Sequence, residues 1–122
     1  MDRLLMKHAH VIDPSQEIDQ ECDVLVENGC IRSLDDTPAD YDGPVMDAQG
    51  LFLAPGLVDM HVHLRDPGFT QKEDILTGCA AAAAGGFTSI ASMPNSNPVC
   101  DNPDVIKYII GRSQTARAKV YP

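Results

Sequence analysis

A chain of 122 residues is about one domain long and can bury only a modest core. With 43% hydrophobic and 22% charged residues, and no apolar run near the ~20 residues that span a bilayer, it is typical of a globular protein without a membrane partner. The formal net charge of −9 is repelled by phosphate backbones, and no stripe of lysine and arginine offsets it, which excludes nucleic acid as the expected partner. The N-terminus lacks the apolar core and cleavage site of a signal peptide, and we therefore expect a cytoplasmic protein.

Residues 1–54 are predicted to form a β-rich module that is part of a composite β-sandwich. In the segment DVLVENGCIRSL, two alternating apolar runs are joined by Asn28-Gly29, and both residues tolerate the positive φ of a type I′ hairpin turn. Gln49-Gly50 marks a second turn. The acidic stretch 33–44 is typical of a solvated loop.

The four cysteines are predicted to be reduced thiols. They lie far apart, without C-x-x-C spacing and without a secretory signal. A two-residue turn at Asn28-Gly29 would pair Glu27 with Cys30 and leave Cys22 out of register with that position. The remaining cysteines are Cys79 and Cys100.

After Pro55-Gly56 the pattern changes to an alternation of strands and helices. GLVDMHVHL is a predicted strand, and TQKEDILTGCAAAAAGG is a predicted helix. Thr70 and Glu73 match a capping box at the start of this helix, and Gly85 would supply the left-handed residue at its end. The alanines at 80–84 suit close packing on a sheet, and they equally suit a merely helix-favouring run.

A strand, a helix and the beginning of a third strand follow. FTSIASMP is a predicted buried strand, NPDVIKYIIGRSQTARA a helix with Asn102 as N-cap and Pro103 at its first position, and KVYP a strand start. The apolar positions on one face of that helix are Val105, Ile106, Ile109 and Ile110. This order predicts an α/β fold with parallel strands and helical crossovers, either a doubly wound sheet or a (β/α)8 barrel.

The pair His61 and His63 is the main candidate for a metal site. Residues two apart in a strand point to one face about 6.5 Å apart, so both imidazoles can reach one zinc ion. The pair ends a strand, which is where a (β/α)8 barrel builds its active site. Asp59, two residues earlier, is a candidate outer-shell acceptor. His8 and His10 have the same spacing, but the exposed polar face of a sandwich explains them.

Arg65 and Asn95 are candidate contacts for an anionic substrate. Arg65 continues the odd-numbered series of His61 and His63, and a guanidinium beside a metal is matched by a substrate carboxylate. The alternative is a loop salt bridge from Arg65 to Asp66 or Asp74. Asn95 ends the second strand, where its amide can donate to an anion or form an Asx-turn.

The segments PGLVDMHVHLRDPG and TGCAAAAAGGFTSIASMPNSNPVCDNP resemble the dihydroorotases of the amidohydrolase superfamily, in particular the longer bacterial, cytoplasmic type. The resemblance runs from about Ala48 to the end of the chain, and the L-R-D-P-G and M-P-N-x-x-P motifs are its most specific parts. It implies that His61 and His63 ligate the more buried zinc of a one- or two-zinc centre. It further implies that Arg65 and Asn95 hold the substrate carboxylate, whereas Asp59 has no direct catalytic role.

The implied reaction is the reversible cyclisation of N-carbamoyl-L-aspartate to L-dihydroorotate in pyrimidine synthesis. Zinc would polarise the amide carbonyl and supply hydroxide for ring opening. The implied fold is a β-sandwich-like module followed, over 55–122, by the first two to three βα units of a (β/α)8 barrel. A whole barrel needs about 250 residues, so further zinc ligands and the general acid/base are expected beyond residue 122. We expect an N-terminal portion that is inactive alone.

Three alternatives stay open. The chain could belong to another cyclic amidase, such as a dihydropyrimidinase, hydantoinase or allantoinase, although Arg65 with Asn95 argues against it. It could belong to a non-catalytic dihydroorotase-like subunit that scaffolds a transcarbamoylase, or it could be a free-standing small β/α protein. The full-length enzyme is expected to form a homodimer or a complex with aspartate transcarbamoylase.

Overall fold

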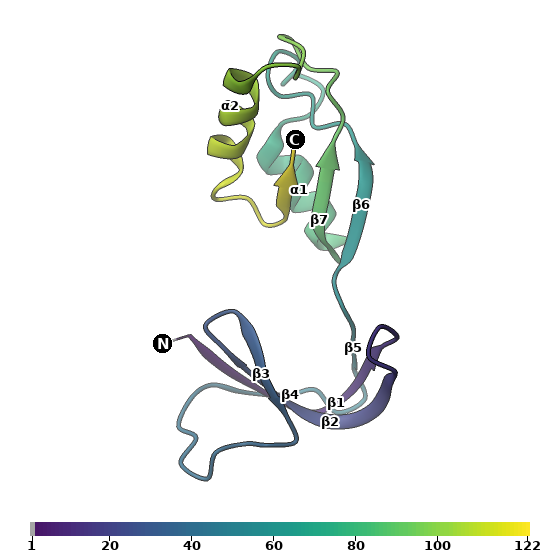
Figure 1. Ribbon diagram of the computed structural model, residues 1–122, viewed down its shortest axis with the longest axis vertical. Helices are drawn as coiled ribbons and strands as arrows, with labels where there is room; N and C mark the ends of the chain where they lie inside the picture. Colours follow the sequence, from purple (N-terminus) through teal and green to yellow (C-terminus); the bar gives the residue numbers. More distant parts are fainter. Residues whose placement is uncertain (1) are drawn as a thin grey trace. The chain divides into compact units, whose positions relative to one another are not determined.

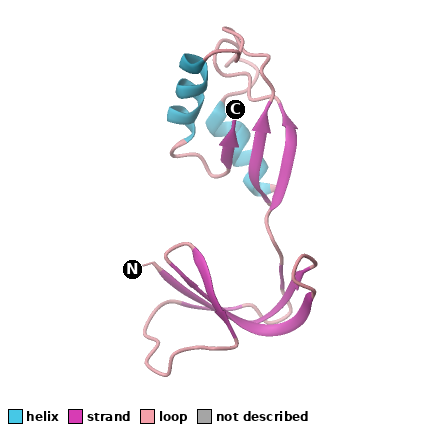
Figure 2. Ribbon diagram, viewed as in Figure 1, coloured by secondary structure: helices cyan, strands magenta, loops and turns pink. Residues whose placement is uncertain are grey.

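The computed structural model describes residues 2–122, which divide into two compact units, Met1–Pro55 and Gly56–Pro122. Figure 1 labels their helices and strands along the chain. Unit 1 is a five-stranded β-sheet, and unit 2 combines a three-stranded sheet with two helices. The predicted α/β fold class is therefore confirmed at this level, as the cyan helices and magenta strands of Figure 2 show.

Unit 1 is built around its two longest strands, which pair antiparallel. The sheet order is β3-β2-β1-β4, and β5 also pairs with β1. Both short strands, β4 and β5, run parallel to β1. The strand bounds are β1 Arg3–Asp13, β2 Ile18–Glu27, β3 Cys30–Leu34, β4 Val45–Asp47 and β5 Phe52–Leu53.

The hairpin between β2 and β3 has the predicted two-residue turn. Asn28 and Gly29 have φ values of 52° and 76°, and Glu27 pairs with Cys30. The positive φ at both central positions matches the right-handed twist of the flanking strands. All four cysteines are free thiols, which confirms that prediction.

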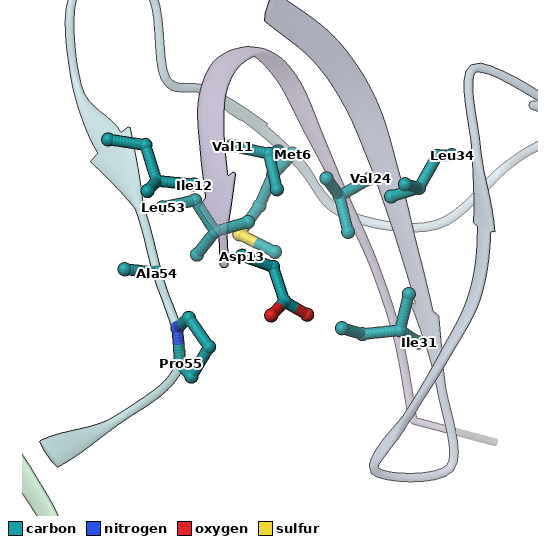
Figure 3. Close-up of a pocket in the computed structure, with 10 residues that line it drawn as sticks. All are labelled: Met6, Val11, Ile12, Asp13, Val24, Ile31, Leu34, Leu53, Ala54 and Pro55. Atoms are coloured by element: carbon teal, nitrogen blue, oxygen red, sulfur yellow. The ribbon is translucent and has the colours of Figure 1, made fainter. Parts of the chain in front are cut away.

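The core of unit 1 is small because the sheet is a single layer. Its buried cluster consists of Ala9, Val11, Cys22, Val24 and Ala48. Beside it lies an apolar hollow of about 210 Å³, lined among others by Val24, Ile31 and Leu53, with Asp13 as its one charged lining residue (Figure 3).

Unit 2 has the predicted alternation of strands and helices. Its sheet order is β6-β7-β8, and both strand pairs are parallel. A single buried cluster joins both helices to the sheet, with Ile75, Ile90 and Ile109 among its members. The bounds are β6 Leu57–Val62, α1 Ile75–Ala84, β7 Phe87–Ser92, α2 Pro103–Ser113 and β8 Lys119–Tyr121.

The predicted start of α1 is wrong. The helix begins at Ile75, and Asp74 is its N-cap: the Asp74 carboxylate accepts the backbone N–H groups of Leu76 and Thr77, and the Thr77 hydroxyl oxygen accepts the Asp74 N–H. The segment at Thr70 forms a turn instead, in which the Lys72 N–H donates to the Phe69 carbonyl. The capping box therefore lies four residues further on, next to the apolar run that anchors the helix.

The predicted end of α1 is off by one residue. Gly85 is the C-cap with φ of −86°, and Gly86 is the left-handed residue with φ of +84°. The helix also has a close contact at Gly78, where an added Cβ would lie 2.7 Å from Leu64 Cδ2. A small residue at 78 therefore lets α1 approach the segment that follows β6. Of the alanine run, Ala82 packs against the core.

The predicted caps of α2 are confirmed. The Asn102 side chain accepts the N–H groups of Asp104 and Val105, and Pro103 occupies the first turn. Of the predicted apolar face, Val105 and Ile109 are buried. The other two positions, Ile106 and Ile110, remain 38% and 48% exposed. No helix within residues 2–122 is long and apolar enough to cross a membrane.

Candidate functional site

The end of β6 departs from regular strand geometry. Its register with β7 shifts, because Asp59 lies opposite Ile90 and Val62 lies opposite Ser92, so that three residue steps on β6 match two on β7. Such a bulge interrupts the alternation of side chains between the two faces. The prediction that Asp59 and Arg65 share one strand face with the histidines assumed a regular strand over all four residues. The bulge shows that this assumption is wrong.

The two histidines nevertheless lie close together. Their ring centroids are 5.3 Å apart and the rings are inclined at 71°. Two imidazoles that share a tetrahedral zinc ion at ~2.1 Å hold their centroids roughly 5 Å apart. The spacing of His61 and His63 therefore fits joint binding of one ion. Within residues 2–122 no cluster of three or more His, Cys, Asp or Glu side chains surrounds them, so this pair is only part of a ligand set.

The orientation of the His63 ring is set by Asn95. The distance between His63 Nδ1 and Asn95 Oδ1 is 2.9 Å. Because an amide oxygen only accepts, Nδ1 carries the proton and Nε2 keeps its lone pair. The second predicted substrate contact is thus hydrogen-bonded to a predicted metal ligand. The Asn95 side chain therefore contacts His63 and does not form the alternative, an Asx-turn.

Asp59 contacts the backbone of the bulge rather than an imidazole ring. Its Oδ1 accepts the His61 N–H at 2.9 Å. Together with His63 and residues of α1 such as Gly78 and Ala82, it lines an open hollow of about 310 Å³. Asp59 therefore stabilises the irregular backbone at His61 and does not contact the imidazole of either histidine.

Arg65 lies beyond the strand, in the left-handed region with φ of 62°, and is half-buried. Among residues 2–122 no carboxylate forms an ion pair with it. Of the two carboxylates considered as its partners, Asp66 contacts Tyr108 and Arg112, and Asp74 caps α1. The guanidinium is left available to a ligand.

The loops that follow β6 and β7 are joined to each other. The Met93 N–H donates to the Val62 carbonyl at 2.8 Å, and the Asn97 N–H donates to the Pro67 carbonyl at 2.9 Å. Gly68, with φ of +96°, packs so closely that a Cβ would overlap the Asn97 carbonyl oxygen. This joint brings the loop with Arg65 next to the loop with Asn95.

Asp66 was considered in the sequence only as a possible salt-bridge partner of Arg65, and the burial of this carboxylate against α2 was not predicted. Asp66 is 3% exposed, accepts a hydrogen bond from the Tyr108 hydroxyl at 2.9 Å, and lies 3.9 Å from Arg112 Nε. The hydrogen bond with Asp66 raises the pKa of Tyr108 above its usual value. The sequence signal for this contact was the i, i+4 spacing of Tyr108 and Arg112, which places both side chains on one face of a helix, where they can bind the same carboxylate.

The other histidine pair has a different environment. His8 lies at a bulge in β1 with φ of 58°, and its Nδ1 is 3.1 Å from Asp47 Oδ1. His10 Nε2 is 2.6 Å from Asp19 Oδ1. The hydrogen bond from His8 lowers the pKa of Asp47. Each ring of this pair thus has its own carboxylate partner.

The fold is similar to that of solved hydantoinases. The structure matches an L-hydantoinase (dihydropyrimidinase) from Arthrobacter aurescens with a TM-score of 0.81 and 25% identity, over 96% of this chain and 26% of that chain. It matches a D-hydantoinase with a TM-score of 0.73 and 25% identity, over 98% of this chain and 26% of that chain. Paired histidines at the end of a strand therefore occur here in a hydantoinase-like fold.

The sequence narrows this class to one family. Residues 50–122 match the sequence model of the dihydro-orotase-like family, and the chain therefore belongs to this family. The dihydroorotase of Geobacter sulfurreducens is 58% identical over 112 residues, which cover 91% of this chain and 26% of the relative. The dihydroorotase of Aquifex aeolicus is 50% identical over 115 residues, which cover 94% of this chain and 27% of the relative. The resemblance inferred from the motifs is confirmed, and the chain spans about a quarter of the length of these relatives.

Proposed function

We propose that the protein containing this chain is a zinc-dependent dihydroorotase that interconverts N-carbamoyl-L-aspartate and L-dihydroorotate in pyrimidine synthesis. The observation that carries this proposal is the His61–His63 pair, hydrogen-bonded through His63 to Asn95, with Arg65 free of any ion pair within residues 2–122. The chain corresponds to the N-terminal portion of such an enzyme. Unit 1 is then part of a composite β-sandwich, and unit 2 the beginning of a (β/α)8 barrel.

His61 and His63 would hold the zinc. Because Nδ1 of His63 faces Asn95, the free Nε2 is the atom left for the metal. Bound zinc supplies a Lewis acid for the ring carbonyl and lowers the pKa of a water molecule. The remaining ligands and the general acid/base come from residues after 122, since a catalytic zinc usually has three protein ligands.

Arg65 and Asn95 would hold the substrate carboxylate. A guanidinium binds a carboxylate through two parallel hydrogen bonds. The Asn95 oxygen is occupied by His63, which leaves the two N–H groups of its amide to donate to the same carboxylate. This arrangement favours L-dihydroorotate over uncharged rings, because a neutral ligand would leave the half-buried Arg65 guanidinium without a partner.

The location and assembly of the full-length enzyme belong to the same proposal. We propose that it is cytoplasmic and forms a homodimer or a complex with aspartate transcarbamoylase. Light scattering of the purified full-length protein, alone and mixed with the transcarbamoylase of the same organism, tests the assembly.

The deciding experiment measures metal content and turnover of the full-length protein. We expect zinc to co-purify, ring opening of L-dihydroorotate to be lost on chelation, and activity to return with added zinc. A scaffold subunit would show no turnover with zinc restored. Faster turnover of dihydrouracil or hydantoin than of L-dihydroorotate would instead support another cyclic amidase, the function named for the two structural neighbours.

A further inference from the structure

The loop after β6 contains a carboxylate that the proposed chemistry does not use. The side chain of Asp66 is 2% exposed although it directly follows Arg65 and precedes an exposed glycine turn. A buried carboxylate is unfavourable unless it is paired and hydrogen-bonded. Here the Tyr108 hydroxyl donates to Oδ1 at 2.9 Å, and Arg112 Nε lies 3.9 Å from Oδ2. Both partners belong to α2, so Asp66 links the loop to that helix by a hydrogen bond and an ion pair.

The same loop is held from its other side. The Phe69 N–H donates to the Arg65 carbonyl at 2.8 Å and closes a turn over residues 65–69. Within that turn, the Pro67 carbonyl accepts the Asn97 N–H, and Gly68 packs on Asn97. The turn is thus fixed to α2 through Asp66 and to the loop after β7 through Pro67 and Gly68.

Arg65 depends on this fixation in two respects. Its left-handed backbone, with φ of 62°, is unfavourable for a residue with a Cβ and persists only where the surroundings impose it. In addition, Asp66 is the nearest carboxylate in sequence and would compete with a substrate for the guanidinium if it were free. Engagement with Tyr108 and Arg112 keeps it away.

We propose that Asp66, held by Tyr108 and Arg112, is a positioning residue that fixes Arg65 for the substrate carboxylate and so sets the preference for anionic rings. The proposal rests on the proposed dihydroorotase function. Its partners lie on α2, whereas Asn95, the partner of His63, lies in the loop after β7. Asp66 therefore acts on the affinity for the carboxylate and leaves the metal and the reacting amide unaffected.

The test compares single and double variants of the full-length enzyme with L-dihydroorotate as substrate. Asp66→Asn is expected to raise KM about tenfold with kcat within about twofold, which is the pattern for loss of a contact made equally in ground and transition states. Tyr108→Phe, which removes one hydroxyl and keeps the packing, is expected to raise KM about threefold. Asp104→Asn, an exposed carboxylate on the same helix, serves as the matched control and leaves both constants unchanged.

A double-mutant cycle separates positioning from general stabilisation. Arg65→Ala removes the group through which Asp66 acts, so adding Asp66→Asn to it is expected to leave KM at the value of the single Arg65 variant. Additive effects, or a fall in kcat with KM unchanged, would overturn the inference. An unmutated enzyme that does not open L-dihydroorotate contradicts the proposed function and the inference with it. An active enzyme whose Asp66→Asn and Tyr108→Phe variants match the Asp104 control contradicts the inference alone.

Discussion

The chain contains two His-x-His sequences with identical spacing, both at a bulge of a strand, and the side chains around the two pairs differ. In β1, His8 faces Asp47 and His10 faces Asp19, so each imidazole is matched with a separate carboxylate. At the end of β6, the two rings lie 5.3 Å apart, and His63 is hydrogen-bonded to the neutral amide of Asn95. A hydrogen bond at one ring nitrogen leaves the other nitrogen free in both pairs, and either a carboxylate or an amide can be the outer-shell partner of a metal-bound histidine. The candidate metal site is instead distinguished by the closeness of its two rings and by its place at the end of a parallel strand, next to the loops with Arg65 and Asn95.

The largest expected difference between the two pairs is in metal content. In the full-length enzyme, His61→Ala or His63→Ala should abolish zinc binding at that position and reduce turnover by roughly a thousandfold or more. His8→Ala and His10→Ala should retain zinc and activity. Metal analysis of the purified proteins and ring-opening rates check this. Zinc loss in the His8 or His10 variants would remove the distinction.

The partners of the two pairs provide a second comparison. Asn95→Ala removes the hydrogen bond to His63 Nδ1 and should weaken zinc affinity about 10- to 100-fold, the usual effect of losing an outer-shell partner. Asp19→Ala removes the equivalent partner of His10 and should leave zinc affinity unchanged. Competition with a zinc chelator measures both. Equal affinities in the two variants would show that Asn95 does not orient a ligand.

The loop joint next to His63 has a close backbone contact at Gly68. Gly68→Ala forces a Cβ into a backbone with φ of +96° and onto the Asn97 carbonyl. We expect a loss of about 2 kcal/mol in the free energy of unfolding, by analogy with other strained positions. Gly29→Ala, at φ of +76° with open space around it, is the control that separates strain from overlap and should cost less. Urea denaturation compares the two.

The smallest expected effect is the pH response of the His8–Asp47 pair. The hydrogen bond from His8 lowers the pKa of Asp47 from 3.8, so this contact contributes stability above pH 3.8 that is lost as the pH falls through the lowered value. In His8→Ala the midpoint of the Asp47 carboxyl resonance in NMR should rise towards 3.8. The midpoint of Asp74, whose pKa is lowered by the Thr77 N–H, should stay where it is.

Local sequence signals predicted most of the elements correctly. The hairpin at Asn28-Gly29 and the cap at Asn102-Pro103 are short-range features in which the residue type determines the backbone, and both are confirmed. The parallel order of β6, β7 and β8 followed from the alternation of strand and helix patterns. Where two chemically suitable residues competed, the prediction was wrong by a few positions, as at Thr70 against Asp74.

The site was predicted less completely because it depends on departures from regular structure. Strand alternation placed Asp59 and Arg65 beside the histidines, but the bulge in β6 and the left-handed turn at Arg65 cannot be read from periodicity. The contact of His63 with Asn95 joins residues 32 positions apart, and that of Asp66 with Tyr108 joins residues 42 apart. The residue types were anticipated at His63 and Asn95, but their pairing required the fold.

The amide of Asn95 has one further consequence for equilibrium measurements. Its oxygen bonds a ring that would ligate zinc, and its nitrogen is the group left to face a substrate carboxylate. If bound zinc changes the affinity for substrate through this side chain, bound substrate must change the affinity for zinc by the same factor, because linkage between two binding sites is reciprocal. Titrating zinc with and without bound substrate, in the wild type and in Asn95→Ala, would therefore measure how much of the coupling between the two ligands depends on this side chain.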